Sequence, residues 1–424
     1  MNYPDSVQFL YALGNEIKTA KFGLERIETA LEAMGDPQRD MRFVHVAGTN
    51  GKGSTCAMIE SGLRAAGRRT GLFTSPHLIE PTERIAIDGK RVTAAEFARA
   101  FDRVHQCVEK LVAQGAVDWH TTYFETVTAM AFLIFAEERV NEVVLEVGLG
   151  GRLDATNVVT PELSVITPVD FDHEAYLGKS LDAIAGEKAG ILKRGAPAVF
   201  ARQRPEAAKV LERRAAELGI DVDRADEWQV SDLEIDARGS RFRLSGRCEL
   251  QIVCPLAGQH QVDNAATAAV ALARIGVPHE AIERGIAQAR WPGRLERVSE
   301  NPEIILDGAH NPAGARALAR YIERFYAGRR VRMIYGAMRD KAVEEIGGIL
   351  FPQAAQVVAT APRQARALAP DSIREMTSHP NVATAATLED ALELVRDAEK
   401  NDAIFITGSL FLVAEARALL GVKT

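Results

Sequence analysis

VAGTNGKGS, residues 46–54, is the stretch that decides the fold. The β-branched run that leads into it from residue 42 predicts a strand, and the helical periodicity that follows it to residue 67 predicts a helix. Its glycines leave backbone N–H groups free to close around an anion, and the start of a helix adds partial positive charge. The stretch therefore predicts a phosphate-binding loop between a strand and a helix.

The side chains of this loop suit a nucleotide that is bound with a divalent cation. Lys52 supplies a point charge for the β and γ phosphates, and Ser54 offers a hydroxyl to Mg²⁺. The spacing departs from the usual GxxxxGK[ST], because Gly48 and Gly51 are closer together and Gly53 stands between Lys52 and Ser54. A glycine-rich turn that binds nothing is the alternative interpretation.

Apolar runs and helical patterns alternate beyond the loop. Helices are predicted over 94–113 and 123–138, and strands of the buried type over 141–148 and 163–169. This alternation predicts a parallel sheet that is covered by helices on both faces. Residues 227–254 differ, because short alternating strands separated by turn residues indicate a small antiparallel patch on the same domain.

A second series of strands and helices begins after WPGRLERVSENPE, residues 291–303. Two prolines and a glycine among charged residues indicate an interdomain linker here, which we expect to act as a hinge. The predicted fold class is α/β. A P-loop-containing parallel-sheet ATPase domain with the antiparallel patch is expected over 1–296, and a Rossmann-like α/β domain over 297–424.

Composition limits the classes of protein to which the chain can belong. Of its 424 residues, 47% are hydrophobic and 26% are charged, as is typical of globular domains. The net charge of −7 argues against a nucleic-acid coat or a binder of anionic membranes. The four cysteines form no CxxC pair, so we expect reduced thiols. Without a signal peptide pattern or an apolar run of about 18 residues, we expect a cytoplasmic protein.

Carboxylates and one imidazole follow two of the predicted strands. Glu146 and Asp154 surround a glycine turn after one strand, and the next strand is followed by Asp170, Asp172 and His173. We expect these groups at the ends of adjacent strands, in the sheet that also holds the phosphate loop. Oxygen ligands with one imidazole suit Mg²⁺ or Mn²⁺, whereas a single carboxylate is more typical of a turn cap.

Two further residues leave two interpretations open. Lys188 lies in a helical run, where a solvated face is the simpler interpretation of the spacing. His310 lies near Asp307 at a strand-to-helix turn. It either contacts a bound nucleotide or packs as a satisfied core histidine.

Distinctive motifs run along nearly the whole chain. Besides the phosphate loop, they are KFGLERI (21–27), FTSPHL (73–78), TERI (82–85), EVGLGGRLDATN (146–157), DHEAYLG (172–178), IAGEKAGI (184–191), GQHQVDNA (258–265), WPGRLE (291–296), LDGAHNP (306–312) and TGSLFL (407–412). In this order and number they resemble the folylpolyglutamate synthase and dihydrofolate synthase family, a branch of the Mur ligase superfamily. The chain departs from the family pattern at Asp170, where a glycine is common.

The resemblance implies an ATP-dependent amide ligase. Such an enzyme adds L-glutamate to dihydropteroate, and to folates through the γ-carboxyl, by way of an acyl phosphate. GRLDATN at 151–157 resembles the bacterial bifunctional enzymes, which favours both activities over a monofunctional folylpolyglutamate synthase. The early position of the phosphate loop counts against a cell-wall Mur enzyme. A nucleotide-dependent switch, the alternative from another class, would not need Glu146, His173 and Lys188 together.

The resemblance also implies roles for particular residues. The nucleotide ligands would be Gly51, Lys52, Gly53, Ser54, Asn264, Arg294 and Asp307. The magnesium ligands would be Ser75, Glu146 and His173, and the catalytic residues would be Lys52, His173 and Lys188. The pterin substrate would contact Gly23, Leu24, Glu25, Arg26, Thr122, Tyr123, Phe124, Glu125, Leu153, Asp154 and Ala155. Phe124 would stack on the pterin ring, with simple core packing as its alternative.

Cofactors and partners follow from the same resemblance. We expect ATP, one or two Mg²⁺ ions and, as a further candidate, K⁺. Lys188 matches a lysine that the family carbamylates, which would place a carboxylate-like group near a second metal ion. The expected partners are small molecules, namely dihydropteroate, folates, L-glutamate and ATP, with no nucleic acid and no membrane. We expect a monomer.

Overall fold

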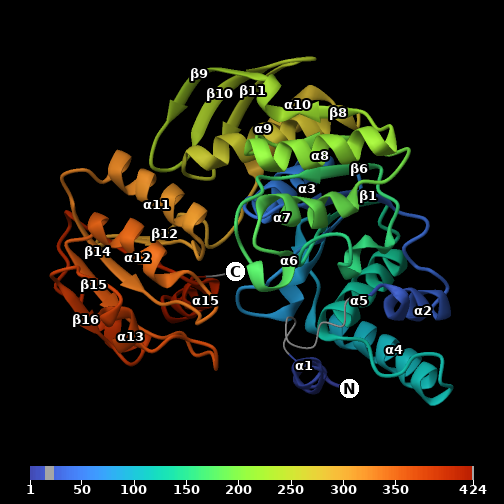
Figure 1. Ribbon diagram of the computed structural model, residues 1–424, viewed down its shortest axis with the longest axis horizontal. Helices are drawn as coiled ribbons and strands as arrows, with labels where there is room; N and C mark the ends of the chain where they lie inside the picture. Colours follow the sequence, from blue (N-terminus) through green and yellow to red (C-terminus); the bar gives the residue numbers. More distant parts are fainter. Residues whose placement is uncertain (15–22, 423–424) are drawn as a thin grey trace. The chain divides into compact units, whose positions relative to one another are not determined.

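A computed structural model of the chain describes residues 1–14 and 23–422 (Figure 1). The chain divides into two compact units. The first contains residues 1–231, 243–252 and 263–289, and the second contains 232–242, 253–262 and 290–424. The start of the motif at 21–27 lies outside the described residues.

The first unit is built on an eight-stranded sheet with the order β4-β3-β2-β5-β1-β6-β7-β8. Its strands are β1 (Arg42–Ala47), β2 (Thr70–Phe73), β3 (Ile85–Ile87), β4 (Lys90–Arg91), β5 (Glu142–Glu146), β6 (Leu163–Ile166), β7 (Ala198–Phe200) and β8 (Val222–Arg224). The strands from β2 to β8 in this order are parallel, and β3 and β4 add an antiparallel edge. The predicted α/β fold class is confirmed.

One detail of the predicted sheet is wrong. The strands at 141–148 and 163–169 were expected to be adjacent, but β1 lies between β5 and β6 and pairs with both. Strands that are consecutive in the sequence are joined here by a connection that crosses β1. The phosphate loop that follows β1 is therefore flanked by the two carboxylate-bearing segments rather than lying to one side of them.

Helices and buried side chains hold this sheet in place. The helices of the first unit are α1 (Tyr3–Ala12), α2 (Glu25–Ala33), α3 (Lys52–Ala65), α4 (Ala94–Ala113), α5 (Tyr123–Glu137), α6 (Glu174–Leu177), α7 (Leu181–Lys188), α8 (Pro205–Leu218) and α10 (His279–Gln288). Phe101 of α4 and Phe132 of α5 share one buried cluster with Phe43 of β1. Both helices begin at a capping box, in which a threonine and the glutamate three residues later each accept a hydrogen bond from the backbone N–H of the other.

A small three-stranded sheet and one helix continue across the division between the units. The strands β9 (Gln229–Ile235), β10 (Ser240–Ser245) and β11 (Glu249–Cys254) are joined by tight turns in the order β11-β10-β9. Alternate residues of β10 and β11 are buried, as the predicted antiparallel patch requires. The helix is α9 (Gln259–Arg274).

The second unit contains a six-stranded sheet with the order β12-β13-β17-β14-β15-β16. Its strands are β12 (Glu296–Glu300), β13 (Glu303–Leu306), β14 (Arg330–Tyr335), β15 (Gln356–Ala359), β16 (Val382–Thr384) and β17 (Asp402–Thr407). Its helices are α11 (Pro312–Phe325), α12 (Val343–Leu350), α13 (Pro370–Glu375), α14 (Leu388–Glu393) and α15 (Leu410–Leu419). All pairs are parallel except β12 with β13.

The stretch 291–303, predicted as a linker, forms part of this second sheet. It contains β12, which pairs with β13 at the sheet edge. Its charged residues are paired with partners: Glu296 forms an ion pair with the buried Arg417. Charge and proline content therefore indicated a linker where the chain forms an edge strand.

No helix in the described part of the chain is long and apolar enough to cross a bilayer.

Candidate active site

Predicted site residues lie at the carboxyl ends of four neighbouring strands of the first unit. In the order β2-β5-β1-β6, Ser75 follows the first strand, Glu146 ends the second, the phosphate loop follows the third and His173 follows the fourth. The carboxyl ends of parallel strands are where open α/β sheets bind ligands. Sheet topology therefore collects at one place groups that lie far apart in the sequence.

The phosphate loop is held in a shape that requires glycine. Gly48 and Gly51 have φ angles of +151° and +86°, in the region that favours glycine. A Cβ at Gly48 would overlap the hydroxyl of Thr167, and one at Gly51 would overlap the side-chain oxygen of Asn264. Thr49 Oγ1 donates to the Asp170 carbonyl at 2.9 Å and accepts from its amide at 3.1 Å. The loop is thus clamped between the segment after β6 and helix α9.

Two lysines meet at one carbonyl of this loop. Lys52 Nζ donates to the Gly48 and Thr49 carbonyls at 3.2 and 3.3 Å, and Lys188 Nζ donates to the Gly48 carbonyl at 2.9 Å. Lys188 is only 4% exposed, so the solvated-face interpretation of its spacing is wrong. Helix α7 ends at this residue and directs its side chain into the site.

The surroundings of Lys188 lower its pKa to about 7. Burial is the largest cause, because it removes water from the ammonium, and the positive charge of Lys52 adds to it. The carboxylates of Asp172, Asp154 and Glu187 act in the opposite direction. A large fraction of the Lys188 side chains is therefore uncharged near neutral pH, which makes this amine a nucleophile or a proton acceptor.

The donor set at the ends of β2, β5 and β6 fits a hard divalent cation. Glu146 is 3% exposed, and its Oε2 accepts the amide hydrogen of Ser75 at 3.0 Å, so these two residues are neighbours. The charges of Glu146 and Lys52 both act on the buried thiol of Cys56 in α3, whose pKa burial raises well above its usual range. A carboxylate, a hydroxyl and an imidazole leave coordination positions open for phosphate oxygens and water.

His173 lies at the N-terminus of α6 in an unusual backbone conformation. Its φ of +52° is in the left-handed region, which residues other than glycine adopt infrequently. Its amide donates to Asp172 Oδ1 at 2.9 Å, which fixes the turn. Asp170, at the position where the family commonly has glycine, accepts from the Phe171 amide at 2.9 Å and from Arg204 at 3.3 Å. The aspartate thus takes part in the turn before His173.

Several predicted pterin contacts are engaged with one another. Arg26 donates to both oxygens of Glu125 at 2.8 Å, and Glu125 also caps α5 by accepting the Thr122 amide at 2.7 Å. The half-buried Phe124 ring packs on Gly148, beyond the end of β5, and its centroid lies 5.9 Å from that of Phe73. Core packing and ligand stacking are both compatible with this position.

Asp154 is a buried group that shapes the glycine turn after β5. Its Oδ2 accepts the Leu149 amide at 2.8 Å, and its Oδ1 accepts the amide and hydroxyl of Thr156 at 3.0 and 2.5 Å. Burial raises its pKa, although these hydrogen bonds oppose the change. His45 of β1 extends the network, because its Nε2 lies 2.9 Å from the Thr156 hydroxyl.

Sequence patterns did not point to Thr49, Thr167, Thr156 or His45. Three of them lie in or next to loops and His45 lies in β1, and a single polar residue in such places gives no periodic signal. The only available hint was that His45 interrupts an apolar run. Burial lowers the His45 pKa to about 3, so this imidazole is uncharged.

The predicted nucleotide ligands of the second unit form a cluster of their own. Asp307 is buried, and its carboxylate accepts the Leu295 and Ala309 amides at 3.0 and 2.9 Å. Burial raises its pKa, while the charge of Arg294 lowers it. Gly308 leaves room for the Arg294 guanidinium, and His310 Nδ1 lies 2.8 Å from the Gly308 carbonyl.

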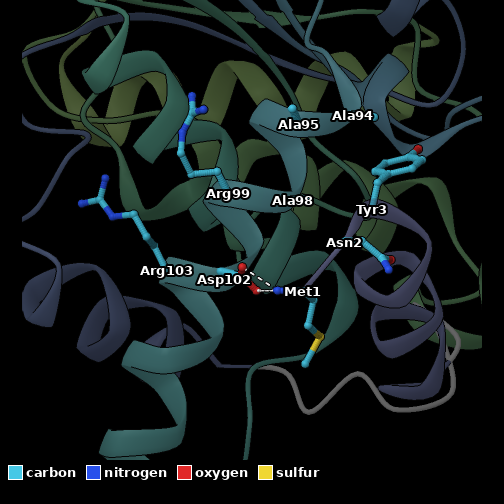
Figure 2. A pocket seen from close by; sticks show the side chains of 9 residues that line it. All are labelled: Met1, Asn2, Tyr3, Ala94, Ala95, Ala98, Arg99, Asp102 and Arg103. Carbon is cyan, nitrogen blue, oxygen red and sulfur yellow. Dashed lines mark hydrogen bonds and ion pairs between the residues drawn. The ribbon is translucent and has the colours of Figure 1, made fainter.

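A hollow of about 520 Å³ lies where the start of α1 meets α4 (Figure 2). Asp102 on its wall accepts two bonds of 2.6 Å from the N-terminal amine of Met1. None of the predicted site residues lines this hollow, so it is separate from the candidate active site.

Comparison with family models identifies the class of protein. The Mur ligase middle domain matches residues 46–272, and the Mur ligase glutamate ligase domain matches residues 293–410. The first match covers the phosphate loop together with Ser75, Glu146, His173 and Lys188. The chain therefore contains a Mur ligase middle domain followed by a Mur ligase glutamate ligase domain.

Individual relatives refine this assignment. The chain is 36% identical to dihydrofolate synthase/folylpolyglutamate synthase of Bacillus subtilis, over 94% of this chain and 95% of the relative. It is also 36% identical to folylpolyglutamate synthase of Lacticaseibacillus casei, over the full length of both. Folylpolyglutamate synthase of Mycobacterium tuberculosis, solved with ADP and AMPPCP, superimposes with a TM-score of 0.92 at 36% identity over both whole chains. The chain belongs to the dihydrofolate synthase/folylpolyglutamate synthase family of Mur ligases, as its motifs predicted.

Proposed function

We propose that this protein is an ATP-dependent ligase that joins L-glutamate to dihydropteroate, and to folates through the γ-carboxyl. The observation that carries the proposal is the convergence of Lys52 and Lys188 on a glycine-rich phosphate loop beside the buried Glu146. This arrangement, in a chain of this family, suits phosphoryl transfer between two anions. A switch protein needs the loop but has no use for the second lysine.

The reaction divides into two steps. An oxygen of the acceptor carboxylate attacks the γ-phosphorus of ATP, the bond to the bridging oxygen breaks and ADP leaves. The amine of glutamate then attacks the carbonyl carbon of the acyl phosphate and loses a proton, and inorganic phosphate leaves with the former carboxylate oxygen. Loop N–H groups and Lys52 would offset the negative charge that gathers on the transferred group.

Ser75, Glu146 and His173 are the residues that would hold Mg²⁺. When bound, this ion would neutralise charge on the triphosphate. Arg294 and Asp307 of the second unit, and Asn264 beside Gly51, are proposed as nucleotide ligands.

Lys188 is proposed to be carbamylated. Its Nζ would attack the carbon of CO₂ as a neutral amine and lose one proton to water, which gives an anionic carbamate. Its burial and its lowered pKa favour this step. The change would place a negative charge beside Lys52, so that the two side chains form an ion pair near Gly48.

For the pterin substrate, we propose the wall formed by Phe124 and the turn at 148–155. Arg26 and Glu125 would hold the N-terminus of α5, which carries Phe124, in position.

We also propose that the protein is a cytoplasmic monomer. Light scattering of the purified protein and fractionation of the host cell test this last point.

Mass analysis of products provides the main test. Dihydropteroate or tetrahydrofolate is supplied with glutamate and MgATP, and each product should gain one glutamate residue with release of ADP. Extension of tetrahydrofolate alone would leave a monofunctional folylpolyglutamate synthase. ATP hydrolysis that needs neither acceptor nor glutamate would favour a switch. Oxygen-18 in the acceptor carboxylate should appear in the released phosphate.

A further inference from the structure

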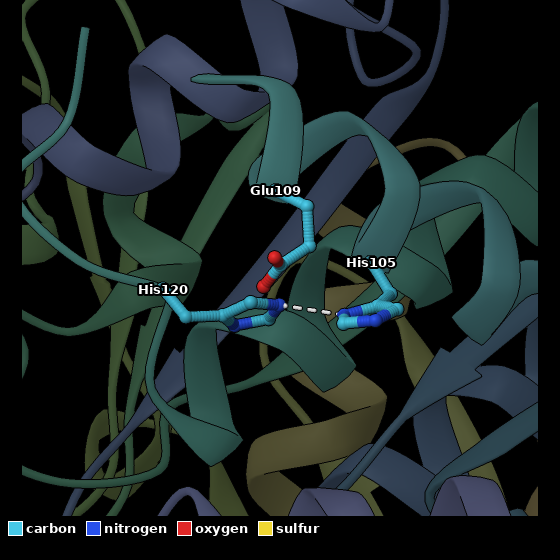
Figure 3. Close-up of side chains that lie close together, drawn as sticks. All are labelled: His105, Glu109 and His120. Carbon is cyan, nitrogen blue, oxygen red and sulfur yellow. Dashed lines mark hydrogen bonds between the residues drawn. The ribbon is translucent and has the colours of Figure 1, made fainter. Parts of the chain in front are cut away.

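Two histidines and a glutamate gather at α4 and the segment that follows it (Figure 3). His105 and Glu109 lie one turn apart on α4, and His120 lies in the segment between α4 and α5. One ligand atom from each of the three residues lies within 4.8 Å of the other two. The proposed ligase reaction uses none of them.

The spacing of the two imidazoles matches a shared metal ion. His105 Nδ1 and His120 Nε2 are 3.1 Å apart. With metal–nitrogen bonds of about 2.0–2.1 Å, two nitrogens on one ion are separated by about 3.0 Å at a right angle and about 3.4 Å at a tetrahedral angle. The observed separation falls between these limits, so an ion can take the place of the hydrogen between the two nitrogens when that proton moves to His105 Nε2 or to water.

The second nitrogen of His120 selects the tautomer that a metal requires. His120 Nδ1 lies 3.0 Å from the Thr121 carbonyl oxygen, which can only accept a hydrogen bond. The proton is therefore assigned to Nδ1, and the lone pair on Nε2 faces His105. Ligating histidines usually donate their other N–H to a carbonyl or carboxylate in this way, which fixes the ring.

Aromatic neighbours fix the orientation of both rings. Phe101 stacks on His105 at 5.4 Å between centroids with planes 10° apart, and Phe9 contacts His105 and His120 edge-on at 4.6 and 5.5 Å. Burial lowers the pKa of His120, and a ligating imidazole must offer an unprotonated nitrogen to the metal. Glu109 is exposed, which leaves the outer side of the cluster open to water.

We propose that His105, Glu109 and His120 bind a divalent transition-metal ion such as Zn²⁺, with water completing its coordination. Two imidazoles and one carboxylate suit such ions better than Mg²⁺, which prefers oxygen. The ion would tie α4 to the segment that enters α5 at Thr122, where Glu125 pairs with Arg26. Its role would be to stiffen this region.

Zinc binding to tag-free protein, measured by calorimetry with MgCl₂ in excess, tests the proposal. Excess Mg²⁺ occupies the proposed magnesium site, so a high-affinity equivalent of Zn²⁺ reports on another site. His105→Ala and His120→Ala should each weaken binding by at least about tenfold. His279→Ala, which removes an exposed histidine on α10, is the matched control and should bind as the wild type does.

Co²⁺ provides a second, spectroscopic readout. Its visible absorption bands should appear with the wild type and disappear with His105→Ala. Glu109→Gln alters an exposed side chain without disturbing the packing, so its reduced affinity would support the site even if a histidine variant failed to fold. Absence of stoichiometric binding, or equal binding by wild type, His105→Ala and Glu109→Gln, would show that the imidazoles form only a hydrogen bond and would overturn the proposal. Neither result depends on ligase activity.

Discussion

Replacing Lys188 with methionine is expected to stabilise the protein near neutral pH while abolishing its ligase activity. The Lys188 pKa falls from 10.5 to about 7 on folding, so between these values the unfolded chain binds a proton that the folded chain lacks. The free energy of unfolding therefore rises with pH across this range. At about 1.4 kcal/mol per pH unit, the lysine costs about 5 kcal/mol near pH 7. The variant also loses the hydrogen bond to Gly48, which destabilises it by about 1 kcal/mol. The free energy of unfolding of the variant should therefore exceed that of the wild type by about 3–4 kcal/mol.

The assay is urea unfolding of wild type and Lys188→Met in buffers free of CO₂, which keep the lysine unmodified. The variant's advantage should be largest at pH 7 and below, and between pH 7 and about 10.5 it should shrink by about 1.4 kcal/mol for each pH unit. Lys209→Met, at an exposed position of α8, should differ from wild type by no more than about 0.5 kcal/mol at any pH. A less stable Lys188→Met variant, or an advantage independent of pH, would refute the reasoning from burial.

Three other substitutions probe the loop and the proposed pterin wall. Lys52→Ala should remove most ligase activity, measured as ADP release with both acceptor and glutamate, without lowering the melting temperature. The control Lys209→Ala should leave activity unchanged. Normal turnover by Lys52→Ala would mean that the loop does not hold the triphosphate. Gly48→Ala should destabilise the protein by about 2 kcal/mol, because its Cβ has no space at a positive φ, and an unchanged urea midpoint would contradict this. Arg26→Ala should cost about 3 kcal/mol by leaving the Glu125 carboxylate buried without its ion pair, and adding Glu125→Gln should restore part of the loss; equal stability of the single and double variants would count against this pairing.

Long elements with a clear period were predictable from the sequence. The runs that became β1, α3, α4, α5 and β5 were placed to within a few residues, since each is long enough to show its period or ends at a glycine turn. Strands of three residues, such as β7, β8 and β16, were missed because so short a run shows no period. The edge strand β12 was missed for another reason: its charges are paired in three dimensions, and the sequence does not reveal the partners.

The candidate site was predictable where motif order carried the information and not where packing did. The resemblance named Ser75, Glu146 and His173, and the sheet places them at the carboxyl ends of three strands of one sheet. Helical spacing alone favoured a solvated Lys188, because periodicity within one helix does not indicate what other elements cover it. The order of β5, β1 and β6 likewise depends on a crossing connection that no local pattern encodes.

The clamp on the phosphate loop has a consequence for protein synthesis on the ribosome. Thr49 and Asn50 donate their amide hydrogens to the Pro168 carbonyl, and Asn264 lies against Gly51. A growing polypeptide that has exposed the loop but not yet these later segments lacks these contacts and keeps only the local ones, such as those of Lys52 with Gly48 and Thr49. Nucleotide binding should therefore appear late in translation, after most of the first unit has left the exit tunnel, and stalled nascent chains of increasing length should gain it abruptly once residue 264 has emerged.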